Sequence, residues 1–175
     1  PFSVEREIML NAIRPARPDD LGKLPAVERA AAALFRNTPY PHLADSSLIS
    51  EEIDLLNDLI WVATDANDEP IGFVIAQAIP GSVFIREIDV DPRYARRGIG
   101  AQLIDTVAKW ARGHEAPALT LTTFSDVPWN GPYYTRLGFQ TLDLATLTPE
   151  LKRIYQEEAD AGLPMAKRIV MYKPL

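Results

Sequence analysis

The sequence predicts a single α+β domain built on a mixed, largely antiparallel sheet. Three β-rich runs, at 60–64, 72–79 and 83–90, follow one another with short connections, which is typical of an antiparallel meander. An amphipathic segment at 98–112 then separates the third run from another at 119–124, and a crossover of this kind joins parallel strands. A doubly wound nucleotide-binding fold would lack the meander, so the combination favours the α+β class.

The first part of the chain predicts a strand and a helix. We expect residues 1–10 to be an extension outside the domain, which spans 11–175. Residues 11–16 have strand character and are closed by prolines, and Asp19 or Asp20 can cap the helix that follows. The apolar stripe of this helix consists of Leu24, Val27, Ala31 and Leu34.

A loop and a second helix are predicted before the meander. Residues 37–45 contain two prolines, which favour a loop. Residues 47–59 predict a helix that Ser47 or Ser50 would cap. Residues 65–70 have the composition of a hairpin turn between the first two strands of the meander.

The last third of the chain predicts two helices and two strands. A short helix at 128–137 precedes a strand at 139–143. Thr148 opens a last helix, because a proline at the first helical position and an early acid follow it. Residues 166–172 form the closing strand. Since no repeat or linker interrupts the chain, one domain is expected.

Composition narrows the functional classes. The 175 residues are 47% hydrophobic, include no cysteine and carry a formal net charge of −6. The lack of cysteine excludes disulfides and cysteine nucleophiles, and the negative charge argues against a dedicated nucleic-acid surface. No apolar run approaches the roughly 20 residues of a membrane span, and the N-terminus lacks a signal-peptide pattern. We expect a cytoplasmic protein without a membrane partner or a metal, since His42 and His114 are isolated in the sequence.

The strongest functional signal is the turn between the strand at 83–90 and the helix that follows. The turn places Arg96 and Arg97 ahead of Gly98 and Gly100, and a helix N-terminus offers free backbone N–H groups to an anion. The glycines let a phosphate approach the main chain because they carry no Cβ. Neither the dinucleotide-binding fingerprint nor the P-loop fits this turn. It therefore predicts a phosphate-bearing ligand of another type.

Three blocks of the sequence resemble the GNAT superfamily of acyl-CoA N-acyltransferases. Residues 95–100 are similar to the family signature Gln/Arg-x-x-Gly-x-Gly/Ala, with Ala95 in place of the usual Gln or Arg. Residues 129–139 are similar to the family's Tyr-x-x-x-Gly-Phe segment, with Tyr134 in register, and residues 12–21 are similar to its first strand and helix start. The resemblance implies a three-layer α/β/α domain with a central sheet of about six to seven strands.

Acetyl-CoA is the co-substrate that the resemblance implies. In the family, the pyrophosphate rests on N–H groups of the turn before the long helix, and the preceding strand, here Asp89 and Val90, supplies backbone groups to the pantetheine and the thioester. In the family an Asn that binds the pantetheine often lies a turn or more before this position; Asn130, only four residues before Tyr134, falls outside that register and can cap the short helix instead. The expected CoA-binding residues are Val90, Arg96, Arg97, Gly98, Ile99, Gly100, Ala101 and Asn130.

The strand at 83–90 also supplies candidates for a general base. An amine with a pKa near roughly 10 must lose a proton before it attacks a thioester. Alternate residues of a regular strand share one face. The pattern would place two apolar and two acidic side chains together: Val83, Ile85, Glu87 and Asp89. Apolar neighbours raise the pKa of a carboxyl, so Glu87 is the preferred base and Asp89 the reserve; a solvated or ion-paired strand face is the alternative.

Tyr134 is the candidate acid. The resemblance implies that its phenol protonates the leaving thiolate, and a packing role is the alternative. In the resembled family the loop after the first helices lines the acceptor site, and here Phe35, Tyr40 and Trp61 are expected there, whereas His42 is interpreted as a loop tip.

These residues together predict direct acetyl transfer from acetyl-CoA to a primary amine of a small molecule or peptide. Two alternatives stay open: a CoA-binding regulatory module without turnover, and acyl transfer to a hydroxyl. The acceptor itself is open among polyamines, amino acids, antibiotics, protein N-termini and lysines. Pairing through the last helix or strand would give a homodimer, which nothing in the sequence requires.

Overall fold

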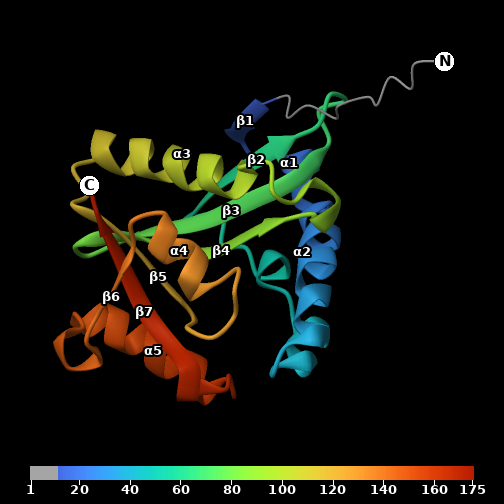
Figure 1. The fold of residues 1–175 in the computed structure, drawn as a ribbon. Helices are drawn as coiled ribbons and strands as arrows, with labels where there is room; N and C mark the ends of the chain where they lie inside the picture. The colour runs from blue at the N-terminus through green and yellow to red at the C-terminus, as the bar shows by residue number, and fades with distance from the viewer. Residues whose placement is uncertain (1–11) are drawn as a thin grey trace.

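The computed structural model describes residues 12–175, so the predicted extension at 1–10 lies outside it. A seven-stranded sheet with the order β1-β2-β3-β4-β5-β7-β6 forms its centre (Figure 1). Neighbouring strands are antiparallel except β4 and β5, which are parallel and are joined through α3. This confirms the mixed, largely antiparallel sheet. The strands are β1 (Ala12–Pro15), β2 (Asp58–Thr64), β3 (Pro70–Ile79), β4 (Ser82–Val90), β5 (Ala118–Phe124), β6 (Gln140–Thr141) and β7 (Arg168–Pro174).

Helices cover both faces of the sheet. The α-helices are α1 (Pro18–Leu21), α2 (Leu24–Ala32), α3 (Ile99–Gly113), α4 (Gly131–Arg136) and α5 (Pro149–Asp160). Short 3-10 turns connect several of them: η1 (Ala33–Asn37), η2 (Pro41–Asp45), η3 (Ile49–Glu51), η4 (Pro92–Tyr94), η5 (Leu144–Thr146) and η6 (Met165–Lys167). Within residues 12–175 no helix is long and apolar enough to cross a membrane.

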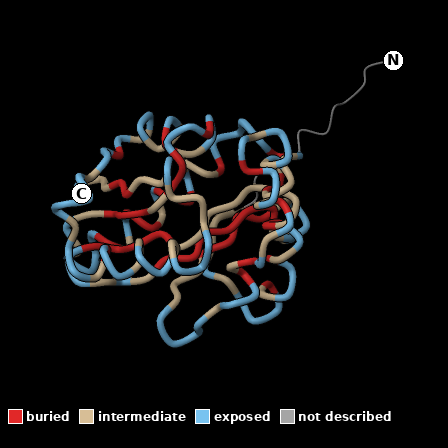
Figure 2. Tube along the Cα trace, turned by 90° about the horizontal axis from the view of Figure 1, so that it is seen from below, coloured by how far each residue is buried: buried red, intermediate tan, exposed pale blue. Residues whose placement is uncertain are grey.

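Alternating side chains of the central strands build two cores. Val74 of β3 packs with Leu103 and Val107 of α3, whereas its neighbours Phe73 and Ile75 pack with the residues of α2 on the other face. Figure 2 shows the buried residues concentrated along the central strands, with exposed segments around them. The sheet therefore forms the middle layer of the predicted three.

Two predicted elements end earlier than the sequence suggests. The stripe of the first long helix was expected to reach Leu34, but α2 ends at Ala32 and continues as the 3-10 turn η1, which leaves the Leu34 side chain exposed. The strand expected at 139–143 is reduced to the two residues of β6 at the edge of the sheet.

The helix expected at 47–59 is wrong. The segment contains the 3-10 turn η3 and a tight turn, and β2 begins at Asp58. Side chains bind its backbone in ways that compete with a helix: Glu28 accepts from the first N–H groups of η3, and the carboxylate of Asp58 accepts the N–H of Asp54 at 2.7 Å. These partners come from tertiary structure, which the helical spacing of apolar residues does not reveal.

The parallel pair β4–β5 is joined over a short stretch. Only Val83, Phe84 and Ile85 of the described β4 residues pair with β5, although β4 continues to Val90. A buried hydrogen bond of 2.8 Å between the hydroxyls of Ser82 and Thr120 lies at this paired end. Past Ile85 the two strands diverge, and the divergence opens the middle of the sheet towards the carboxyl end of β4.

Candidate active site

A β-bulge in β4 controls which side chains face the opening. Ile75 of β3 pairs with Glu87, but the next residue of β3 pairs with Ile85, so Arg86 is an extra residue in β4. The extra residue reverses the alternation of side chains along the rest of the strand. Glu87 and Asp89 therefore lie opposite Ile75 and Phe73, on the α2 face of the sheet.

The expected common face for Val83, Ile85, Glu87 and Asp89 is therefore wrong. Val83 and Ile85 are buried in the core under α3, on the opposite side from the two acids. The physical reason is the bulge, since a strict two-residue period would have kept all four side chains together. The bulge separates the apolar part of β4 from the part that carries the acids.

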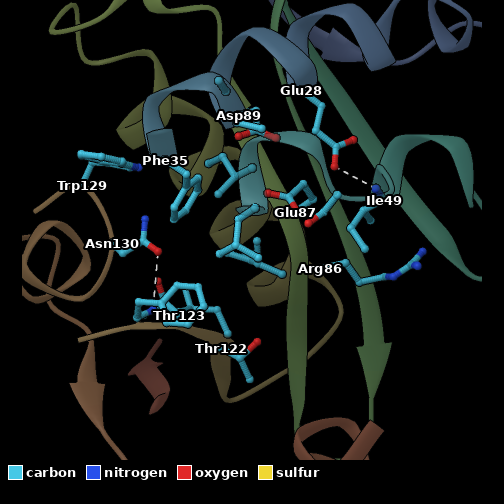
Figure 3. A pocket seen from close by; sticks show the side chains of 18 of the residues that line it. Glu28, Phe35, Ile49, Arg86, Glu87, Asp89, Thr122, Thr123, Trp129 and Asn130 are labelled. Carbon is cyan, nitrogen blue, oxygen red and sulfur yellow. Dashed lines mark hydrogen bonds between the residues drawn. The ribbon is translucent and has the colours of Figure 1, made fainter. Parts of the chain in front are cut away.

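The divergence of β4 and β5 forms a cavity of about 1000 Å³. Residues of α2, the 42–52 loop, β4, the turn before α3, β5, α4 and α5 line it, and Figure 3 shows many of them from close by. Sequence-predicted site residues converge on this cavity from separate parts of the chain: Phe35, Glu87, Asp89, Val90, Arg96, Gly98, Ile99, Gly100, Asn130 and Tyr134. The predicted residues Tyr40, Trp61, Arg97 and Ala101 are not in its lining.

Three carboxylates meet at the cavity wall. Glu28, Glu87 and Asp89 each place one oxygen within 4.8 Å of the others (Figure 3). Burial raises the pKa of Glu87 to about 7, and the charge of Glu28 adds to this effect. Burial and the charge of Glu87 also hold the pKa of Asp89 well above its usual range. The side chains of Glu87 and Asp89 interact through a hydrogen bond, and the Oδ2 atom of Asp89 is buried without a hydrogen-bond partner.

The turn before α3 combines positive charge with an open backbone. Gly98 lies at the helix N-cap with φ +73°, a left-handed conformation that favours glycine, and Arg96 has φ +60°. A Cβ at Gly100 would lie 2.8 Å from the Tyr133 hydroxyl, so the helix start and α4 approach each other closely at this point. The first N–H groups of α3 have no partners within the helix and are available to an anion.

Tyr134 lies on α4 and faces the same cavity as the carboxylates. Its ring packs edge-on against Phe139 at 5.7 Å between centroids. Burial raises the pKa of the Tyr134 phenol, and the charges of Glu87 and Asp89 raise it further. The phenol is therefore protonated at neutral pH and can act as a hydrogen-bond donor to an anionic group in the cavity.

Asn130 joins the start of α4 to the end of β5. Its Oδ1 atom accepts a long hydrogen bond of 3.5 Å from the backbone N–H of Phe124 (Figure 3), and its side chain makes no cap bond to α4. The capping role considered from the sequence is thus not observed. A Cβ at the next residue, Gly131, would lie 3.1 Å from the carbonyl oxygen of Phe124. The two strand-to-helix contacts hold α4 beside the open end of β5.

Of the three expected acceptor residues, only Phe35 reaches the cavity. It packs edge-on against Trp129, a half-exposed residue of the cavity lining, with 5.8 Å between ring centroids. Tyr40 is instead buried, stacks on Phe124 and donates its hydroxyl hydrogen to Asp126 at 2.9 Å. The Tyr40 ring and its hydroxyl are both used in packing the loop.

Trp61 lies on the other face of the sheet. It is buried under α3, edge-on to Trp110 at 6.4 Å. The prediction failed because side chains alternate between the two faces of β2. This alternation places the Trp61 side chain on the α3 face of the sheet, away from the cavity. His42, which the sequence indicates is a loop tip, also lines the cavity.

Sequence reasoning missed the groups that depend on distant partners. Glu28 is a charged member of a helix face that otherwise carries apolar residues, and this exception was the one available signal. Arg168 of β7 pairs with Glu158 of α5 at 2.9 Å and donates to the Thr122 hydroxyl at 3.0 Å. No local motif marks this second group, because it is assembled from β5, α5 and β7.

Residues 27–139 match the Acetyltransferase (GNAT) family. This chain belongs to the GNAT acetyltransferase family. The match includes β4, the turn before α3, α3 itself and the Tyr134 segment, all of which contribute residues to the cavity lining.

Solved GNAT structures share the fold over nearly the whole chain. PaiA N-acetyltransferase from Thermoplasma acidophilum, crystallised with coenzyme A, has a TM-score of 0.70 at 17% identity and covers 94% of this chain and 98% of its own. A GNAT acetyltransferase from Staphylococcus aureus Mu50 has a TM-score of 0.68 at 16% identity, with the same coverage. The ribosomal-protein-S18-alanine N-acetyltransferase from Escherichia coli has a TM-score of 0.63 at 18% identity, covering 93% and 92%.

Proposed function

We propose that this protein is an acetyl-CoA-dependent N-acetyltransferase that acetylates a primary amine by direct transfer. The observation that carries the proposal is the convergence, in one cavity, of the turn before α3, the Glu87–Asp89 pair and Tyr134. An anion site, a base and a proton donor are the three groups that transfer from a CoA thioester to an amine needs. Membership of the GNAT family supports the same reaction class.

The turn before α3 and the open part of β4 fit the donor. The first N–H groups of α3 would hold the pyrophosphate, with the side chains of Arg96 and Arg97 nearby, and glycines at 98 and 100 leave room for it. Beyond Ile85 the edge of β4 is not paired with β5, so its backbone groups, as far as Val90, can bind an extended pantetheine arm as a neighbouring strand would. Acetyl-CoA would supply the acetyl group as a thioester.

Glu87, with Asp89 beside it, is the proposed base. A pKa near 7 leaves the Glu87 carboxyl partly ionised at neutral pH and able to accept a proton from an ammonium group, directly or through water. Tyr134, whose phenol stays protonated, is proposed to donate a hydrogen bond to the departing sulfur. Holding both reactants in one cavity would supply much of the acceleration.

Thiol release from acetyl-CoA tests the proposal. We expect release with at least one member of a panel of diamines, amino acids, aminoglycosides and peptides with free N-termini. Tyr134→Phe should lower kcat by roughly 10²-fold because it removes the proton donor, while the Kd for CoA measured by calorimetry stays the same. The matched control is Tyr172→Phe, which removes an exposed hydroxyl on β7 that binds Gln140; its kcat should equal the wild-type value.

The same assay separates the alternatives. Heat on CoA titration without thiol release to any amine would favour the regulatory module. Release with alcohols alone would show transfer to a hydroxyl. A lack of any binding to CoA would remove the basis of the proposal.

A further inference from the structure

Glu28 is a buried acid on the core-facing side of α2. Glu28 is 6% exposed, and its neighbours on the same side of the helix, Leu24 and Val27, are core residues. Its two carboxylate oxygens accept the backbone N–H groups of Ile49 and Ser50, each at 2.8 Å, and Figure 3 shows the first of these bonds. Such charge-assisted bonds compensate a buried carboxylate for lost water.

These two bonds fasten one wall of the cavity. Ile49 and Ser50 belong to η3, which packs against α2 and β4. The loop around η3 contributes residues 46–49 and Glu52 to the cavity lining. Without the carboxylate of Glu28, the first N–H groups of η3 would lose their partners, and the wall would lose its link to α2.

The same carboxylate lies beside the proposed base. One oxygen of Glu28 is within 4.8 Å of both Glu87 and Asp89. Other groups facing the pair are Tyr134 from α4, which is protonated, and Arg168 from β7, whose guanidinium is paired with Glu158. His42 of η2 lines the same cavity. The pair therefore experiences one close negative charge and a positive charge that Glu158 partly compensates.

We propose that Glu28 is a positioning residue for the acetyl transfer: it ties the η3 loop to α2 and fixes a negative charge against Glu87 and Asp89. The inference rests on the proposed function, because it assigns Glu28 a role through the base rather than through contact with the substrate. The loop tether shapes the acceptor side of the cavity, and the charge sets how readily the pair gives up its proton.

The charge of Glu28 has a consequence that a tether alone would not have. Because it disfavours the ionised forms of Glu87 and Asp89, its removal should lower their pKa values. The acidic limb of the pH profile of kcat/KM would then move to lower pH, by on the order of one unit for a charge at this distance. A purely structural role would change KM or stability and leave the position of that limb unchanged.

Glu28→Gln tests the inference by two measurements. The amide keeps the shape of the side chain and one acceptor, and removes the charge. We expect the limb of kcat/KM to shift to lower pH and the KM for the amine to rise. We also expect carboxyl-carbon NMR titration of the ligand-free protein to show the Glu87 and Asp89 resonances titrating at lower pH than in the wild type. The control is Glu51→Gln, an exposed acid of η3 outside the cavity lining, which should change neither.

The outcomes distinguish this inference from the proposed function. An absence of thiol release by the wild type would reject the enzyme proposal, whereas the NMR titration would still measure the effect of Glu28 on the pair. An unchanged titration, or a limb that stays in place in Glu28→Gln, would overturn the inference. If Glu28→Gln does not fold, Glu28→Asp decides: retained charge with shorter reach should keep the limb and raise KM, and an unchanged KM would reject the tether.

Discussion

At the scale of single residues, the proposed chemistry depends on two carboxyl groups in one enclosed space. Glu87 and Asp89 are two positions apart on β4, so they project to the same side and share a hydrogen bond. Neither can ionise without raising the cost of ionising the other, and the nearby Glu28 adds to that cost. The pair is thereby suited to exchange a proton near neutral pH, which an ordinary solvated carboxylate is not.

The pH profile of Glu87→Gln tests this arrangement. With the pKa of Glu87 near 7, wild-type kcat/KM for an amine should rise with pH and level off above about 7, because the base must be ionised. The amide cannot accept the proton, so kcat/KM should fall by roughly 10²-fold. The remaining activity should continue to rise towards the pKa of the free amine, near roughly 10.

Steady-state kinetics from pH 5 to 10 would measure the pH dependence of kcat/KM for the wild type and for Glu87→Gln. Asp89→Asn is the companion variant. If Glu87 is the base, Asp89→Asn should keep an acidic limb, because the Glu87 carboxyl can still ionise and the asparagine amide can replace the hydrogen bond from Asp89 that lowers the pKa of Glu87. A Glu87→Gln enzyme with the wild-type limb, combined with a limb lost in Asp89→Asn, would transfer the role of base to Asp89.

The placement of residues that lie in short local motifs could be predicted from the sequence. The glycines of the turn and Tyr134 lie in short motifs, and all of these line the cavity. Glu28 could not be assigned, since its partners Ile49 and Ser50 are 21 and 22 positions away and lie in a segment that was expected to be helical. Tyr40 and Trp61 were misplaced for the same reason: an aromatic side chain has no sequence signal that separates a cavity wall from a core.

At the scale of elements, the proposed donor site depends on the start of α3. The helix begins after Gly98, a residue in a left-handed conformation, and Gly98, Ile99 and Gly100 at this turn line the cavity. That conformation costs a residue with a Cβ about 1 kcal/mol or more, but costs glycine little.

Gly98→Ala is therefore expected to weaken the binding of CoA. The Cβ should either strain the turn or shift it to another conformation, and a loss of about 1.4 kcal/mol would raise the Kd tenfold. Calorimetric titration with CoA would measure it. Gly113→Ala, at the other end of the same helix and with open space around it, is the control and should leave the Kd unchanged. Equal affinities for all three proteins would show that the turn does not hold the ligand.

The order and type of most elements followed from periodicity, but two features did not. The bulge at Arg86 has no marker in its sequence, because a run of alternating residues looks the same with and without an extra residue. The segment at 47–59 has apolar residues at helical spacing, yet Asp54 and Asp58 bind its backbone and close a turn instead. In both cases pairing with another part of the chain overrides the local pattern.

At the scale of the whole molecule, the central sheet is opened by a cavity where β4 and β5 are no longer paired. The strand order could be predicted as far as the meander and the crossover, but the insertion of β7 between β5 and β6 arises from pairing between distant segments. The cavity wall contains the buried carboxyl groups of Glu87 and Asp89. Because burial disfavours their ionised forms, the site should reduce the stability of the folded protein.

Glu87→Gln should reveal this cost as a pH-dependent gain in stability. Folding raises the pKa of Glu87 from 4.5 to about 7, so the ionised form is disfavoured in the folded protein. The contribution of Glu87 to the free energy of unfolding is then largest below about pH 4.5 and falls as the pH rises through 7. Glu87→Gln lacks this fall. The free energy of unfolding of the variant, relative to the wild type, should therefore be higher at pH 8 than at pH 4, by about 3 kcal/mol.

Urea unfolding at the two pH values would measure the difference. Glu51→Gln, which removes an exposed charge, serves as the control and should show no such dependence. A Glu87→Gln protein whose relative stability is the same at both pH values would indicate that Glu87 is as well solvated in the folded protein as in the unfolded chain.

The short pairing of β4 with β5 divides the sheet into two halves, β1 to β4 and β5 to β6, whose separation is set at one end by the Ser82–Thr120 hydrogen bond. The two halves contribute different parts of the cavity: Glu87 and Asp89 lie on β4 in the first half, and Tyr134 lies on α4, which follows β5 of the second half. The angle between the two half-sheets therefore affects the distance between the proposed base and the proposed acid. Substitutions near the Ser82–Thr120 contact, outside the cavity lining, could then alter the proposed reaction without touching a substrate.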